Sequence, residues 1–259
     1  MEEHDAPGTA PDGAHLAAAA HTGPVAASAI DLRNAPATEV YRALEEMVGH
    51  AAYPCLGAKS VYRRHGVAHL VLRDMDDPGT TVVLLRHLRA FGEHALTPGI
   101  FRSFIVSFRA PAHSDEAAFE ESLFSLLQRL HDNDALPWAE GVDADPGSPH
   151  FAFSVAGTAY FLVGLHPAAS RVARRSPLPT VVFNPHVQFQ QLRDQGRYDG
   201  MRTRIRARDE HFQGSVNPMV ADHGESSDAR QYSGRYHGPD WIPPLSVRSP
   251  EPDGRRAEG

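Results

Sequence analysis

Apolar and polar residues alternate along the chain in patterns that predict helices and strands in turn. Residues 38–50 carry apolar side chains at helical spacing, and a second such stretch follows Thr80 or Thr81, either of which is suited to cap a helix. A third helix is expected after Asp115, which together with Ser114 provides the cap, and its apolar residues fall on one stripe. Two more helices are expected at residues 186–195 and 198–212.

Short apolar runs bounded by glycine or proline predict the strands. Two of these runs are split by Gly157 and are typical of a β-hairpin. The predicted strands are residues 67–72, 100–108, 151–154, 159–165 and 180–183. Strands separated by helices, with a hairpin in the middle, predict an α+β or α/β fold in which helices cover a single mixed sheet.

Composition predicts one folded domain between two less ordered ends. Residues 1–34 are rich in Ala, Gly, Pro and Thr without apolar periodicity, so we expect disorder there. Residues 238–259 form a Pro- and Arg-rich tail, in which Trp241 and Ile242 are the candidates for docking onto the domain. Residues 35–237 remain as the core-forming domain.

Charge and cysteine content restrict the class of protein. A net charge of -7 argues against nonspecific binding of nucleic acid, although residues 171–208 are locally basic. The single cysteine excludes an internal disulfide and favours a reducing compartment. No apolar run reaches the roughly 18 residues that a membrane span needs, so we expect a cytoplasmic protein without a membrane partner.

Two histidines stand at predicted strand ends. His166 follows one strand and His186 follows another, and each lies beside a proline. A loop between them carries Arg171, Arg174 and Arg175. Imidazoles near guanidinium groups favour a site for a ligand that coordinates and carries negative charge, while surface ion pairing explains the arginines equally well.

A polar segment near residue 225 carries carboxylates suited to hold a cation. Asp222, Glu225 and Asp228 lie on a stretch that we expect to be a loop outside the core, where binding residues are often found. Arg230 and Arg235 follow closely and are suited to bind an anionic group. A solvated acidic loop with no binding role accounts for the same residues.

An ordered set of short blocks resembles one known family, the YqcI/YcgG family. The resemblance spans about residues 35–235. The blocks are Tyr53-Pro54-Cys55, Phe151-Ala152-Phe153-Ser154, Gly164-Leu165-His166-Pro167, Phe183-Asn184-Pro185-His186, Gln213-Gly214-Ser215 and Ala229-Arg230-Gln231-Tyr232-Ser233-Gly234. Members with assigned roles are heme proteins that N-hydroxylate guanidines, including those of the D-cycloserine and guanitoxin pathways. The resemblance implies heme b and a guanidino substrate, such as L-arginine giving Nω-hydroxy-L-arginine, in specialised metabolism.

Heme iron needs an axial ligand, and three residues compete for that role. His166 is the first choice, His186 the second and the Cys55 thiolate the alternative. Residues expected to contact the cofactor are Arg171, Arg174, Arg175, Ser170 and Phe153. His186, Asp222 and Glu225 are the expected catalytic residues, and Asp222, Glu225 and Arg230 the expected substrate-binding residues.

Other functions remain open. The oxidant implied is O2, with electrons from a redox partner, or H2O2, and a homodimer is one oligomeric state compatible with the sequence. A heme protein oxidising another small nitrogenous metabolite fits the same resemblance. A non-heme iron enzyme would use His166, His186 and either Asp222 or Glu225. A heme-binding module without catalysis would need no acidic loop.

Overall fold

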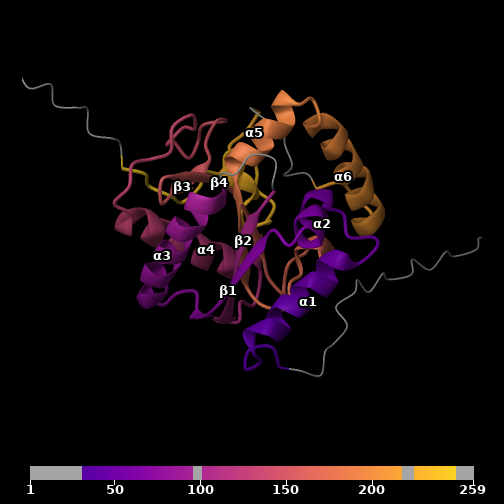
Figure 1. Cartoon of the computed structure of the whole chain (residues 1–259), viewed down its shortest axis with the longest axis horizontal. Helices are drawn as coiled ribbons and strands as arrows, with labels where there is room; N and C mark the ends of the chain where they lie inside the picture. The colour runs from indigo at the N-terminus through magenta and orange to yellow at the C-terminus, as the bar shows by residue number, and fades with distance from the viewer. Residues whose placement is uncertain (1–30, 96–100, 218–224, 249–259) are drawn as a thin grey trace, which may run out of the picture.

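One five-stranded mixed sheet organises the computed structural model, which describes residues 31–95, 101–217 and 225–248 (Figure 1). The strands are β1 (Val67–Asp74), β2 (Ser103–Ala110), β3 (Phe153–Val155), β4 (Thr158–Leu165) and β5 (Thr180–Pro185). Their order is β1-β2-β5-β4-β3, with β1 and β2 parallel and the other pairs antiparallel. This architecture confirms the predicted α+β fold with one mixed sheet.

Helices cover both faces of the sheet, as Figure 1 shows. The helices are α1 (Ala37–Gly49), α2 (Leu56–Arg63), α3 (Pro78–Ala95), α4 (Glu116–Asn133), α5 (His186–Asp194) and α6 (Tyr198–Gln213), with short 3-10 turns η1 (Val172–Arg174) and η2 (Asp228–Gln231). Helices α3 and α4 share a large apolar cluster with one face, whereas α1 and α2 share a smaller cluster with the other. The alternation of residues on β2 explains this split, because Phe104 and Val106 face the first cluster and Ile105 faces the second.

Several predicted local signals hold in the structure. The Asp115 carboxylate accepts a hydrogen bond from the Ala118 backbone N–H at 2.9 Å and caps α4. Gly157 turns the β3–β4 hairpin with a φ of 71°, a left-handed conformation that suits glycine. Trp138 anchors the loop after α4, since its ring packs near Phe151 and its indole N–H donates to the Asp143 carbonyl.

Other predictions of local structure were wrong. The Pro54-Cys55-Leu56-Gly57 stretch, predicted only to end a helix, opens α2, with the Cys55 sulfur capping it at 3.4 Å from the Ala58 nitrogen. Helix α3 starts at Pro78, earlier than Thr80, because proline suits the first turn of a helix. The segment expected to lie outside the core contributes Ala229 and Tyr232, which are 1% and 0% exposed.

The C-terminal segment folds back onto the domain. The Tyr232 hydroxyl accepts a hydrogen bond from the Phe153 N–H at 3.1 Å, and the Tyr232 carbonyl accepts one from the Gly164 N–H at 2.7 Å. Trp241 packs against Phe124 of α4, whereas Ile242 is 77% exposed. The expectations of disorder at residues 1–30 and 249–259 fall outside the described residues.

Candidate functional site

Strand direction separates the two histidines that the sequence suggested as parts of one site. Strands β4 and β5 run antiparallel, with Leu165 opposite Thr180 and Tyr160 opposite Pro185. His166 follows β4 at one end of the sheet, and His186 follows β5 at the other. Six strand residues at about 3.4 Å each place these ends roughly 20 Å apart. His186 therefore does not lie beside His166, and the site expected between them is not formed.

His166 is enclosed by protein. Its side chain is 0% exposed and stacks on Phe119, with ring centroids 4.4 Å apart. Neither ring nitrogen has a hydrogen-bond partner among the described residues. Burial lowers the pKa of His166 to about 4, so the ring is neutral near pH 7 and keeps the lone pair that a metal ligand needs.

The side chains of the arginine loop beside His166 already bind acceptors within the protein. Arg171 forms an ion pair with Asp209 at 2.7 Å. Arg174 is half-buried and donates to the carbonyls of Gly164 and Gln231 at 2.9 and 3.1 Å. The two remaining contact residues expected there are bound as well: Arg175 donates to the Ala169 carbonyl, and Ser170 donates to the Glu116 carboxylate.

Cys55 lies on the other face of the sheet. It packs against the smaller apolar cluster, and burial is the largest effect on its thiol, raising the pKa above the ordinary value. Hydrogen bonds from the backbone N–H groups of Ala58 and Gly57 act in the opposite direction but do not outweigh burial. The thiol is therefore the favoured form of Cys55 in this structure.

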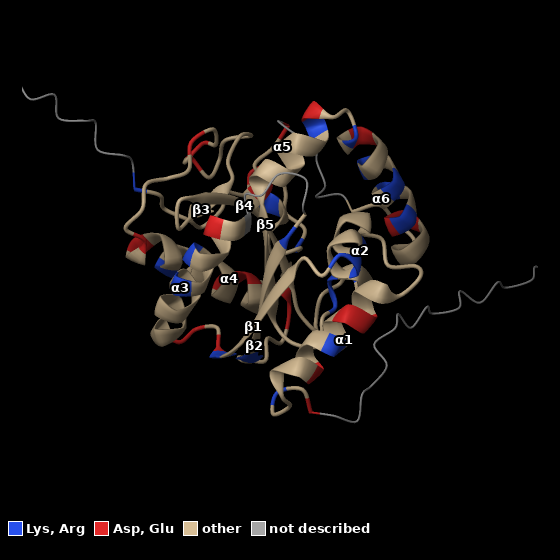
Figure 2. Cartoon of the chain, viewed as in Figure 1, with Lys and Arg blue, Asp and Glu red and all other residues tan. Residues whose placement is uncertain are grey.

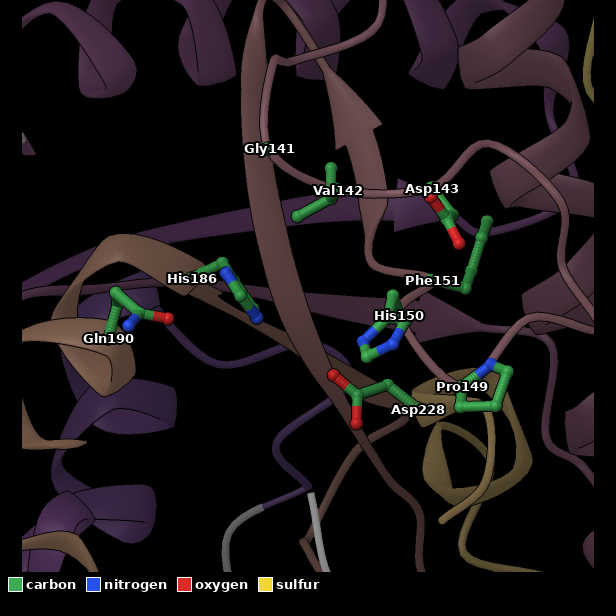
Figure 3. Close-up of a pocket in the computed structure, with 9 residues that line it drawn as sticks. All are labelled: Gly141, Val142, Asp143, Pro149, His150, Phe151, His186, Gln190 and Asp228. Carbon is green, nitrogen blue, oxygen red and sulfur yellow. The ribbon is translucent and has the colours of Figure 1, made fainter. Parts of the chain in front are cut away.

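A cavity of about 510 Å³ opens at the His186 end of the sheet (Figure 3). The loop between α4 and β3 lines it with residues 141–143 and 149–151. Helix α5 contributes His186 and Gln190, and η2 contributes Asp228. In Figure 3 the side chains of His150, His186 and Asp228 point toward one another across this space. Its volume is typical of pockets that bind small molecules.

The fold explains how three distant segments meet there. His186 is the first residue of α5, directly after β5. His150 precedes Phe151, which is 1% exposed and packs near Tyr232. Asp228 opens η2 behind Ser227, whose hydroxyl accepts from the Ala229 N–H at 3.2 Å. Buried aromatic neighbours thus fix both His150 and Asp228 at the cavity wall.

Asp228 carries the strongest electrostatic signal of the cavity. Burial raises its pKa from 3.8 to about 7, and the positive charge of Arg193 only partly offsets that effect. No hydrogen bond or ion pair to its carboxylate is found within the described part of the chain. A carboxylate held in this way exchanges protons near neutral pH and gains free energy when a cation enters.

The remaining predicted residues lie apart from this cavity. Phe153 is 0% exposed in the core, and Glu225 is exposed. Arg230 donates to the carbonyls of residues 238, 239 and 241, and Arg235 pairs with Glu120 at 2.9 Å. Asp222 lies outside the described residues. Sequence reasoning named Asp228 only as one of three loop carboxylates, and it missed His150 and Gln190, which no motif marks.

Within residues 31–95, 101–217 and 225–248, no three His, Cys, Asp or Glu side chains are placed to hold a metal ion. No helix in the same ranges combines the length and the apolar character of a membrane span.

Comparison with known proteins shows the family of the chain. It is 26% identical over 203 residues to a protein described as "Uncharacterized protein YcgG" from Bacillus subtilis (strain 168), covering 74% of this chain and 80% of that protein. No solved structure matches it. The profile of the YqcI/YcgG family matches residues 44–246, a range that includes the whole sheet and every residue lining the cavity. The chain belongs to the YqcI/YcgG family.

Proposed function

We propose that this protein is a heme-dependent N-hydroxylase that binds a guanidino substrate in the Asp228 cavity. L-Arginine is the substrate we favour, with Nω-hydroxy-L-arginine as its product. With H2O2 as oxidant, one oxygen atom enters an N–H bond and the other leaves as water. With O2, a redox partner must also supply two electrons and two protons must be taken up. The observation that carries the proposal is the desolvated carboxylate of Asp228 facing a cavity lined by two imidazoles.

Asp228 is the cation-binding group in this proposal. An ionised carboxylate in a site of low polarity is unfavourable alone, and a guanidinium group supplies both the charge and the paired N–H donors that it lacks. Binding should therefore shift Asp228 from partly protonated to fully ionised. His150 lies where it can exchange a proton with the bound nitrogen, and the buried wall around Phe151 limits the access of water.

Heme b is the proposed cofactor, and the two candidate histidines fit it differently. Bound heme would supply the oxidising power that no side chain here has. His186 offers an imidazole on the wall of a cavity. His166 is neutral and lacks partners, as a ligand requires, but Phe119 stacks directly on it and the arginines nearby already have acceptors. We therefore propose that His186 would hold the iron of a bound heme.

A mononuclear non-heme iron site is the second candidate. Two histidines and one carboxylate, His150, His186 and Asp228, line the same cavity, and this is the ligand set of many iron oxygenases. In the described residues these side chains are not close enough together to hold a metal ion. Iron binding here would require them to move.

The test is the absorption spectrum of the purified full chain after addition of hemin. A Soret band that survives in His166→Leu and disappears in His186→Ala is expected. A band lost only in His166→Leu would move the cofactor to the other end of the sheet, and a band lost only in Cys55→Ala would indicate thiolate ligation. Absence of any band, together with stoichiometric binding of Fe(II), would favour the non-heme site.

Turnover separates an enzyme from a heme-binding module. The pigmented protein should convert L-arginine with H2O2 to a product heavier by one oxygen atom, detected by mass spectrometry. Asp228→Asn should keep the pigment and lose the product. A pigmented wild type that gives no product with L-arginine, agmatine or guanidine, with either oxidant system, would contradict the proposed reaction.

A further inference from the structure

The arginines that the sequence offers for an anionic substrate group are used elsewhere. Arg230 fastens the chain near residues 238–241 through three backbone carbonyls, and its guanidinium lies 6.0 Å from the Trp241 ring. Arg235 is paired with the buried Glu120 carboxylate. If the cavity also recognises an anion, another cation must provide that contact.

Helix α5 places Arg193 on the same helical face as two residues that line the cavity. His186, Gln190 and Arg193 are separated by four and three residues, a spacing that brings all three to one face of a helix. The first two line the cavity. Seven residues at about 1.5 Å each put Arg193 roughly 10 Å from His186 along the helix axis. These three residues therefore form a row on α5 that runs from the His186 imidazole to the positive charge of Arg193.

Arg193 makes contacts within the protein, but one of its donor atoms has no acceptor in the described part of the chain. One guanidinium nitrogen donates to the Gln190 side-chain oxygen at 3.0 Å, which links Arg193 directly to a residue on the cavity wall. The guanidinium carbon lies 5.5 Å from the centre of the Tyr198 ring. Its Nε atom is buried and has no partner among the described residues. A buried donor without an acceptor is unfavourable, and an anionic acceptor that reached it would remove that cost.

Arg193 and Asp228 influence each other without pairing. The Arg193 charge opposes the effect of burial on the pKa of Asp228. They form no ion pair in the part of the chain that the structure describes. Among the described residues, the cavity thus has a carboxylate without a partner on its wall, and a guanidinium with one unpaired donor atom is hydrogen-bonded to Gln190 of the same wall.

From this arrangement we infer that the cavity selects a ligand with a cation at one end and an anion at the other, and that Arg193 determines this specificity. Asp228 takes the cationic end and Arg193 the carboxylate end. The inference rests on the proposed function for the cationic end alone. A guanidino acid is then preferred over a guanidine that lacks the acid group.

Binding, measured by calorimetry on the full chain, tests the inference without depending on turnover. L-Arginine and agmatine share the guanidinium group, and only L-arginine has a carboxylate. Wild type should bind L-arginine about ten- to a hundredfold more tightly than agmatine, the range for one charge-assisted hydrogen-bonded pair. Arg193→Gln should remove that preference while leaving agmatine binding within about twofold. Arg197→Gln, at an exposed arginine four residues further on, is the matched control and should keep the preference.

Each other outcome has a distinct meaning. Equal affinity of wild type for the two ligands, or a preference that survives Arg193→Gln, would overturn the role of Arg193 and leave cation binding at Asp228 standing. Equal loss of both ligands in Arg193→Gln would show a structural role only and would also overturn it. Absence of binding of either ligand to wild type would remove the proposed substrate class, and the inference with it.

Discussion

Replacing Asp228 by asparagine should make the protein more stable and unable to bind a guanidinium cation. Burial is the main reason that the pKa of Asp228 rises from 3.8 to about 7. The folded state therefore holds a proton that the unfolded chain has already lost in this pH range, and folding becomes less favourable as pH rises. Asparagine keeps the shape of the side chain and removes the charge.

The magnitude follows from the interval between the two pKa values. The interval is about three pH units, each worth about 1.4 kcal/mol. Above pH 7 the ionised Asp228 therefore lowers the free energy of unfolding by about 4 kcal/mol. This cost is absent below about pH 3.8, grows between pH 3.8 and 7, and is constant above pH 7. Burying an asparagine amide without hydrogen-bond partners has its own cost of about 1–3 kcal/mol, which cancels part of the stability gained. Above pH 7 the Asp228→Asn variant should therefore gain about 1–3 kcal/mol in free energy of unfolding. Each kcal/mol should raise Tm by about 2–4 °C.

Thermal unfolding of both proteins from about pH 5 to pH 8 measures this effect, and calorimetry with L-arginine measures the loss of binding. The difference in Tm should widen as pH rises to 7 and then stay constant. Asp240→Asn, at an exposed aspartate, is the control and should show no such widening. A variant that is less stable than wild type above pH 7, or a difference that does not change with pH, would refute the desolvation argument.

Three further predictions concern residues outside the cavity. Arg174→Met should lower the free energy of unfolding by more than about 3 kcal/mol in urea, because buried carbonyl groups lose their donor, and a loss below 1 kcal/mol would contradict this. Glu120→Gln should cost about 2 kcal/mol in the same assay, since Arg235 and His237 lose a carboxylate, whereas an unchanged midpoint would show that the pairs contribute little. Cys55 should react with iodoacetamide far more slowly in the native than in the unfolded protein, because burial raises its pKa, and equal rates would indicate an accessible thiol.

Local signals allowed much of the fold to be predicted. Apolar periodicity located α1, α4 and all five strands, and the cap at Asp115 and the turn at Gly157 behaved as their chemistry requires. Helix α2 was missed because proline and glycine near its start resemble a break. Tyr232 was missed as a core residue because its neighbours in sequence are polar, and its burial depends on β3 and β4, which lie far away in sequence.

The site was only partly predictable, for a geometric reason. A strand pattern gives no direction, so His166 and His186 looked equivalent until β4 and β5 were seen to be antiparallel. The sequence pattern likewise does not say which of the charged residues on α6 form ion pairs. The α6 arginines at positions 202, 204, 206 and 208 lie between acidic residues at 199 and at 209–210 (Figure 2), and Arg202 pairs with Asp199 at 3.3 Å. Which carboxylate of the acidic segment is buried was decided by packing around η2.

The folding back of the C-terminal segment has a consequence for synthesis of the protein. Residues 228–248 supply Asp228 to the cavity and part of the larger apolar cluster, including Tyr232, Trp241 and Leu245. A nascent chain that has not yet released this stretch leaves β3 and β4 with uncovered apolar surface and lacks Asp228. The ribosome must therefore translate beyond residue 248 before the domain can close, and chains that stop before that point should be sent to chaperones or proteases.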